Sequence, residues 1–262
     1  MILMKMILQF QMRLKMLLTK DSLHHLLDIP EEHTSLVSLR HSKRAKRLLF
    51  KFSVRNGVEI VLPRLFEESW VIDSVSKRKT LILKRIDEIK KSRLELLPSQ
   101  IQIPLISRSW NVVYADSSSN HSAELKELSD KLVVNSDKSD VFSVPAILQK
   151  WIHNLASDIL PDRLLQISKK MNIGYNRVSV KNQKTRWGSC SEKGNINLNR
   201  NLLFFSEDVV DYVIHHELIH RKVLNHSAKF WSELEAHFPT ARECRFILRQ
   251  EQNNAVPVWA TV

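Results

Sequence analysis

Apolar and polar residues alternate between residues 36 and 62, which is the spacing of strands with one buried face. The apolar positions of this alternation are Val37, Leu39, Leu49, Phe50, Phe52, Val54, Val58, Ile60 and Leu62. An Asn56-Gly57 pair separates two of the runs, and Asn-Gly between alternating segments is a strong signal for a hairpin. The pattern therefore predicts a β-rich segment that contains a hairpin and ends at Pro63.

The apolar spacing becomes helical over residues 66–97. The apolar positions expected on one side of this helix are Trp70, Val75, Leu81, Ile82, Ile86 and Ile89. Lysines and arginines occupy most of the remaining positions, so the pattern predicts one long basic helix. Short strands are expected next, at residues 101–105 and 110–114.

Two Ser/Asn-rich stretches, at residues 116–121 and 135–140, indicate a domain boundary near residue 140. Beyond it the pattern predicts, in chain order, a helix over 145–160, a second helix over 163–171, a strand over 177–180, a turn over 191–194 and a strand over 195–199. A long helix should then begin after Ser206, because serine is a good N-cap and the acidic residues Glu207, Asp208 and Asp211 favour a helix N-terminus.

The N-terminal residues are rich in methionine, but polar side chains interrupt them, and residues 9–16 alternate as a strand would. No small-residue cleavage site follows, so we expect no signal peptide. No apolar run approaches the length of about 18 residues that a membrane helix needs, so we expect no membrane association.

Composition narrows the possible chemistry. The 43% of hydrophobic residues are enough for a core, and four glycines without a Gly-rich phosphate-binding motif disfavour dinucleotide and P-loop chemistry. Cys190 and Cys244 are too few for a disulfide framework, which favours a reducing, cytoplasmic setting. The net charge of +12 is compatible with nucleic acid, anionic substrates or acidic partners, and equally with a solvated basic surface.

The strongest chemical signal is His216-Glu217-Leu218-Ile219-His220 on the last predicted helix. Two histidines four residues apart lie one turn from each other, so both imidazoles can reach one ion. His226 is the third candidate ligand, and Asn225 before it tolerates the left-handed conformation that would end the helix and turn His226 back. Three protein ligands and one open position make a catalytic zinc site.

Glu217 lies beside the first ligand, where such motifs place the general base. Zinc lowers the pKa of bound water toward about 7, and a nearby carboxylate then takes the proton during attack on a carbonyl or phosphoryl centre. The alternative to a metal site is a helix whose histidines are ordinary surface or core residues without a ligand role.

The residues around this motif resemble a known family. The segments that carry the resemblance are Lys184-Thr185-Arg186-Trp187-Gly188-Ser189-Cys190-Ser191, Gly194-Asn195-Ile196-Asn197-Leu198-Asn199, Val209-Val210-Asp211-Tyr212-Val213-Ile214, His216-Glu217-Leu218, Asn225-His226-Ser227 and Phe230-Trp231. They closely resemble the YgjP-like metal-dependent hydrolases, zincin-like proteins related in motif to SprT-type proteases. The similarity is high over residues 145–250 and looser in the N-terminal half. It implies one zinc ion at His216, His220 and His226, a catalytic Glu217, an intracellular setting and peptidase-like activity on poorly defined substrates.

Two residues depart from the family pattern, His215 before the motif and Arg221 after it. Arg221 is four residues from Glu217, so the two can pair on the helix, and pairing would lower the pKa of Glu217 and weaken it as a base. His215 is a possible spare ligand, although it points about 100° away from His216.

Arg186 has two interpretations. It can line the cleft and stabilise an oxyanion or bind a phosphate, beside a strand that pairs with an extended peptide. The structural reading makes Trp187 a core residue and Gly188 a bulge. Cys190 as a fourth ligand would close the metal site, and Cys244 is expected to be a buried thiol. Phe230, Trp231, Leu234 and Phe238 follow helical spacing and are assigned to the core.

We therefore predict an α+β protein with an N-terminal extension over residues 1–30, a smaller basic, β-rich domain over 31–140 and a zincin-like catalytic domain over 141–262. The leading function is zinc-dependent hydrolysis of peptide bonds in a peptide or protein substrate. One alternative is metal-dependent hydrolysis of a nucleotide phosphoanhydride. Another is a nucleic-acid-binding module that uses the basic segments 40–55 and 77–93, either alone or together with proteolysis.

Overall fold

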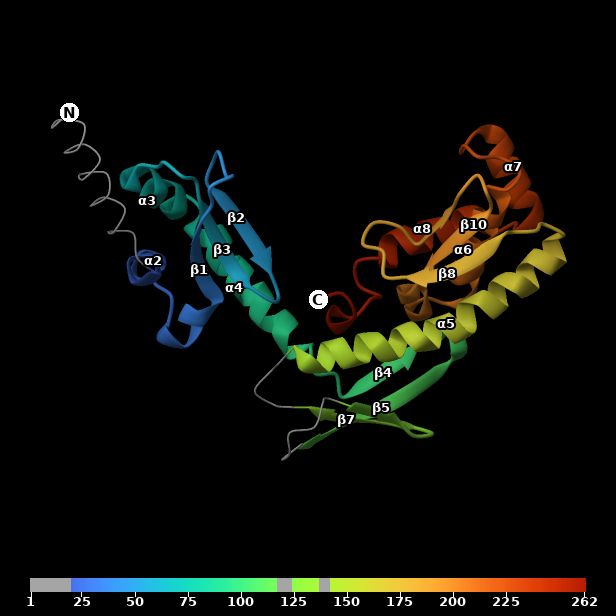
Figure 1. Cartoon of the computed structure of the whole chain (residues 1–262), viewed down its shortest axis with the longest axis horizontal. Coiled ribbons are helices and arrows are strands. Elements are labelled where there is room, and N and C mark those ends of the chain that lie inside the picture. The colour runs from blue at the N-terminus through green and yellow to red at the C-terminus, as the bar shows by residue number, and fades with distance from the viewer. Residues whose placement is uncertain (1–19, 117–123, 137–141) are drawn as a thin grey trace. The chain divides into compact units, whose positions relative to one another are not determined.

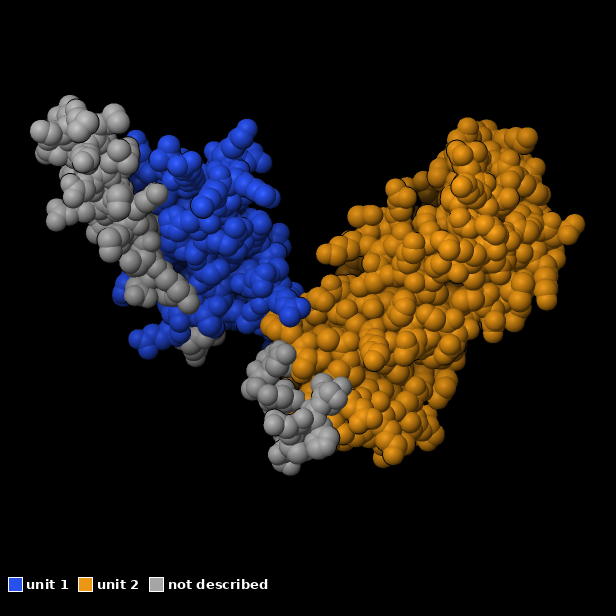
Figure 2. Space-filling model, in the orientation of Figure 1, with its two compact units in different colours: residues 1–94 blue, residues 95–262 orange. Residues whose placement is uncertain are grey.

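The computed structural model describes residues 20–116, 124–136 and 142–262. The chain divides into two compact units, Met1–Leu94 and Glu95–Val262, which are distinguished in Figure 2. The strand expected at residues 9–16 lies outside the described residues. The domain boundary expected near residue 140 also falls in an undescribed segment, and it stays a prediction.

A three-stranded sheet with helices forms the first unit (Figure 1). Its elements are α2 (Lys20–Leu27), η1 (Glu31–Leu36), β1 (Val37–His41), β2 (Leu49–Ser53), β3 (Gly57–Leu62), α3 (Glu68–Ser76) and α4 (Lys79–Leu94). The central strand β3 runs parallel to β1 and antiparallel to β2, so the predicted hairpin is confirmed. Gly57 has a φ of +73°, and a Cβ there would lie 2.1 Å from the Leu36 carbonyl oxygen. Only glycine fits this turn.

The single long helix expected over residues 66–97 is wrong. The segment forms two helices, α3 and α4, because the Arg78 amide donates to the Val75 carbonyl in a tight turn between them. The apolar face differs accordingly: Val75, Ile82, Ile86 and Ile89 are buried, whereas Trp70 and Leu81 are exposed.

The second unit begins with a four-stranded sheet of order β4-β5-β7-β6. Its strands are β4 (Gln100–Ile103), β5 (Arg108–Asp116), β6 (Glu124–Glu127) and β7 (Lys131–Ser136), and η2 (Pro104–Ile106) joins the first two. The strands expected at 101–105 and 110–114 correspond to β4 and β5. The sequence pattern did not indicate β6 or β7, because the Ser/Asn-rich stretches on either side of them suggested a loop.

Helix α5 (Ser143–Met171) is continuous, so the two separate helices expected over 145–160 and 163–171 are wrong. Pro161 lies inside it, where proline removes a backbone donor and normally breaks or kinks a helix. Leu160, Leu164 and Ile167 are buried on both sides of the proline, and their burial favours continuing the helix.

The rest of the second unit positions the histidines. A small sheet contains β8 (Arg177–Lys181), β9 (Gly188–Cys190) and β10 (Asn195–Asn199), with β10 in the centre, parallel to β8 and antiparallel to β9. It is followed by η3 (Arg200–Phe204), α6 (Glu207–Ile219), α7 (Ala228–His237), α8 (Ala241–Glu251) and η4 (Val258–Ala260). Helix α6 packs against β9, α5, α7 and α8. The fold is therefore a mixture of helices and sheets.

None of the helices in the described part of the chain has the length and apolar content that a bilayer crossing requires.

Candidate metal centre

Helix α6 begins after Ser206, as expected, with Glu207 and Asp208 in its first turn. Acidic side chains at this end interact favourably with the helix dipole. His216 lies in the last turn and His220 is the C-terminal cap residue. Their ring centroids are 4.9 Å apart, as expected for residues one helical turn apart.

The loop between α6 and α7 brings in His226. The predicted mechanism for this turn is wrong, because Asn225 is not among the described non-glycine residues with positive φ. The helix instead ends through tight turns in which the Arg221 and Lys222 amides donate to carbonyls three residues back. The Asn225 side-chain oxygen then accepts the Ser227 amide at 3.2 Å, a local turn that positions the next helix.

The three histidines converge. Ligand atoms of His216, His220 and His226 all lie within 4.8 Å of one another, and Nε2 of His216 is 2.9 Å from Nε2 of His226. His226 is exposed, whereas His216 is partly buried. One side of the group therefore faces the protein and the other faces solvent.

Phe230 of α7 supports all three rings. It is fully buried, and its ring centroid lies 4.8 Å from His216, 4.7 Å from His220 and 4.8 Å from His226. Phe230 is thus a core residue, as helical spacing suggested, and it also packs directly beneath the histidines. Sequence spacing gave no indication of this second contact.

Burial favours the neutral imidazole at two of the three histidines. Burial, together with His220, His226 and Arg245, lowers the pKa of His216 to about 3, and burial also lowers the pKa of His220. Nδ1 of His220 is 3.1 Å from the Val223 carbonyl oxygen, which can only accept, so Nδ1 carries the proton and Nε2 keeps a free lone pair. Three imidazole nitrogen donors fit a divalent metal ion.

Glu217 follows His216 on α6 and is buried, with 5% of its surface exposed. Burial raises its pKa to about 8, and the positive charge of Arg186 opposes that rise. Strand β9 covers the carboxylate, because a Cβ on Gly188 would lie 2.6 Å from Glu217 Oε1. Gly188 therefore belongs to a regular strand that contacts Glu217.

The two residues that depart from the family pattern make contacts elsewhere. The Arg221 guanidinium donates to the Glu192 carbonyl at 2.9 Å and to the Gly174 carbonyl at 3.4 Å, and it packs on Gly194. These contacts do not support the expected pairing with Glu217, whose pKa is raised. Nδ1 of His215 is 2.7 Å from the Asp211 carbonyl oxygen.

Neither cysteine belongs to the histidine group found among the described residues. Both are free thiols, and Cys244 is buried as expected. Burial and the neighbouring Glu217 raise the pKa of Cys190.

Other side chains near His216 were not identified from the sequence. The Tyr212 ring lies 5.8 Å from the His216 ring, and the Trp231 ring lies 6.4 Å from it. Arg245 of α8 stacks over Trp231, with its guanidinium carbon 4.7 Å from the ring centroid. Of these neighbours, only Tyr212 could have been predicted from the sequence, because it precedes His216 by four residues on the same helix. Arg245 comes from a different helix, so helical spacing does not reveal it.

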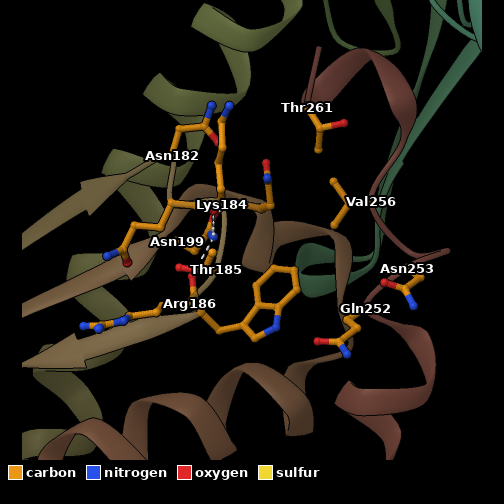
Figure 3. Close-up of a pocket in the computed structure, with 12 residues that line it drawn as sticks. Asn182, Lys184, Thr185, Arg186, Asn199, Gln252, Asn253, Val256 and Thr261 are labelled. Atoms are coloured by element: carbon orange, nitrogen blue, oxygen red, sulfur yellow. Dashed lines mark hydrogen bonds between the residues drawn. The ribbon is translucent and has the colours of Figure 1, made fainter. Parts of the chain in front are cut away.

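Arg186 is among the residues that line a pocket of about 390 Å³, and its side chain points away from the opposite wall (Figure 3). Segment 182–187 forms one wall of this pocket, and residues of the C-terminal segment, including Gln252 and Val256, form the opposite wall. The structure thus places Arg186 on a pocket wall while its charge acts on Glu217. The Trp187 ring packs edge-on against Phe205, with centroids 4.8 Å apart.

Solved structures that are similar to this chain include two metallopeptidase zymogens, jannalysin of Methanocaldococcus jannaschii and abylysin of Pyrococcus abyssi. Each is 29% identical to this chain, with a TM-score of 0.33, over 36% of this chain and 96% of the other. No curated protein matches. The model of the YgjP-like metallopeptidase domain matches residues 46–251, which is most of the sequence. The chain belongs to the YgjP-like metallopeptidase family.

Proposed function

We propose that this metal-dependent peptidase uses one zinc ion, held by His216, His220 and His226, with Glu217 as the general base. The observation that carries the proposal is the convergence of three imidazoles at the end of the helix that also carries the buried Glu217. Three nitrogen ligands leave a zinc ion one position for water or substrate, which is the arrangement of catalytic sites. We further propose that the C-terminal half, residues 141–262, has a zincin-like arrangement around α6.

A bound zinc ion would polarise a peptide carbonyl and make water a stronger acid. Glu217 would take the proton from the attacking water and deliver it to the departing amine. A pKa raised by burial suits this role, because a general base works best when its pKa is near the working pH. Arg186 keeps that pKa from rising further, so we assign it a role in tuning Glu217.

Peptide or protein substrates follow from membership of a metallopeptidase family. The same match offers no support for the nucleic-acid-binding alternative. Several basic side chains of segments 40–55 and 77–93 already have partners: Arg40 pairs with Glu59, Lys77 pairs with Asp73, and Arg78 lies over the Phe50 ring.

The test is cleavage of casein by the full chain, with and without a chelator. Activity should disappear on chelation, return on adding zinc, and fall by about 100-fold or more in Glu217→Gln. Glu243→Gln on the exposed face of α8 is the matched control and should retain activity. Phosphate release from nucleoside triphosphates with the same chelator and Glu217 sensitivity, and no casein cleavage, would contradict the peptidase proposal.

A further inference from the structure

Helix α8 carries three arginines on one side. Arg242, Arg245 and Arg249 are three and four residues apart, which places their side chains one above another along the helix. The acidic residues of α8, Glu243 and Glu251, do not share this spacing and lie on other sides of the helix. The side formed by the three arginines, which we call the arginine face, therefore carries positive charge without an acidic residue of its own helix.

The arginine face lies beside the histidine group. Helix α8 packs against α6 and α7 (Figure 1). The guanidinium carbons of Arg245 and Arg242 are 4.7 Å and 5.5 Å from the centroid of the Trp231 ring. The same ring lies 6.4 Å from the His216 ring. Trp231 is thus a shared neighbour of two arginines and of a proposed metal ligand.

The charges of these arginines act on residues around the metal centre. Burial raises the pKa of the Tyr212 hydroxyl, and Arg245 and Arg249 oppose that rise. Burial and the other two histidines of the group lower the pKa of His216, and Arg245 lowers it further. The Tyr212 and His216 rings are 5.8 Å apart. The electrostatic and geometric evidence therefore agree that the arginine face borders the metal centre.

Arg245 is the arginine best placed to bind an anion. Its guanidinium has no hydrogen bond or ion pair with another described residue, whereas Arg242 pairs with Glu235. Arg245 is only partly exposed, and stacking on Trp231 occupies the flat face of the guanidinium. The N–H groups at its edge are left to donate, in a fork geometry that matches a carboxylate.

We propose that the arginine face makes this peptidase selective for acidic substrates, with Arg245 binding an aspartate or glutamate side chain close to the cleaved bond. The inference rests on the proposed peptidase function and names the substrate class of that site. An extended peptide rises about 3.3 Å per residue, so a carboxylate within about three residues of the cleaved bond can reach the arginine face. Arg242 and Arg249 add to the attraction through the positive field that they create.

The test uses a library of peptides from a digested proteome, incubated with the zinc-loaded full chain, and mass spectrometry identifies the cleaved bonds. We expect aspartate and glutamate to be enriched within about three residues of the bonds that the wild-type protein cleaves. Arg245→Gln should lose this enrichment, and Arg245→Glu should favour lysine or arginine instead. Arg177→Glu on β8, the edge strand on the other side of β10 from β9, changes the net charge equally and should keep the acidic preference.

Matched peptides give the size of the effect. A quenched fluorescent peptide with the preferred glutamate is compared with its glutamine counterpart. In the wild-type protein kcat/KM should be about tenfold higher for the glutamate peptide, as expected for one charge-assisted hydrogen bond. Arg245→Gln should remove this difference through KM and leave the glutamine peptide nearly unchanged. Arg245→Lys should restore part of the preference, because it keeps the charge but not the fork geometry.

The inference is overturned if the wild-type protein shows no acidic enrichment, or if the enrichment persists in Arg245→Glu. Equal losses on the glutamate and glutamine peptides in Arg245→Gln also overturn it, because Arg245 would then only support Trp231. If Arg245→Glu does not fold, Arg249→Glu at an exposed position should weaken the acidic preference, and an unchanged preference overturns the inference. Peptide cleavage without an acidic preference removes this inference alone. No cleavage of any peptide by the zinc-loaded wild-type protein contradicts the proposed function as well.

Discussion

Gly188 on β9 and Glu217 on α6 are in direct contact, and a Cβ on Gly188 would lie 2.6 Å from Oε1 and 2.7 Å from Cγ of Glu217. Real Cβ atoms do not approach other atoms so closely, so either the Glu217 side chain or one of the two elements would have to move. The absence of a side chain at residue 188 therefore lets the strand cover the carboxylate and exclude water from it. That burial raises the pKa of Glu217.

Gly188→Ala should displace the Glu217 carboxylate without removing a histidine. Because a misplacement of about 1 Å can cost about 100-fold in rate, peptidase activity should fall by about 10- to 100-fold while bound zinc stays at wild-type level. Overpacking should also lower the free energy of unfolding by about 1–3 kcal/mol. Gly174→Ala is the matched control, since a Cβ there meets nothing within 4 Å. Equal activity of the two alanine variants would contradict this account of β9.

Phe230→Ala should loosen the three imidazoles together. Removing a buried phenylalanine side chain costs about 3–5 kcal/mol of stability, and the rings would lose their shared support. We expect weaker zinc binding in a competition titration against a chromophoric chelator, in addition to a lower Tm. Phe246→Ala removes a phenylalanine that is 62% exposed and should change stability by less than about 0.5 kcal/mol. Unchanged zinc affinity in Phe230→Ala would show that the ring only fills the core.

The buried carboxyl of Glu217 should give the metal-free protein a defined pH dependence. Its pKa rises from an ordinary 4.5 to about 8 on folding, so the folded state holds a proton that the unfolded chain releases. Stability should therefore decrease between about pH 4.5 and pH 8 by a term that Glu217→Gln lacks. The free energy of unfolding of Glu217→Gln relative to wild type should rise by on the order of a few kcal/mol between pH 5 and pH 8.5.

This comparison is made by urea denaturation in the presence of a chelator. Glu243→Gln, an exposed substitution, should keep a constant difference from wild type across the same range. A constant difference for Glu217→Gln as well would mean that its carboxyl ionises normally in the folded protein.

Features set by local spacing were predictable from the sequence. The hairpin at Gly57 depends on a few neighbouring residues, and the facing of His216 and His220 follows from one helical turn. The positions where helices end were less predictable, because they depend on packing against elements that are distant in the sequence. Pro161 stays inside α5, whereas a tight turn at Arg78 divides a segment with unbroken apolar spacing.

The parts of the site that were missed come from contacts between elements. Gly188 meets Glu217 only because β9 packs on α6, and Arg245 approaches His216 from α8. Arg221 shows the opposite case, in which the sequence suggested an interaction that the structure does not contain. Its helical spacing from Glu217 suggested a pair, but carbonyls of Gly174 and Glu192 from other segments accept its hydrogen bonds.

Zinc content is the most direct test of the central proposal that three histidines hold one ion. The full chain, His220→Ala and the exposed control His237→Ala are each equilibrated with zinc, dialysed and analysed by mass spectrometry of the metal. We predict one zinc per chain for wild type and His237→Ala, and well below one for His220→Ala. One tightly held zinc in His220→Ala, or none in the wild-type protein, would contradict it.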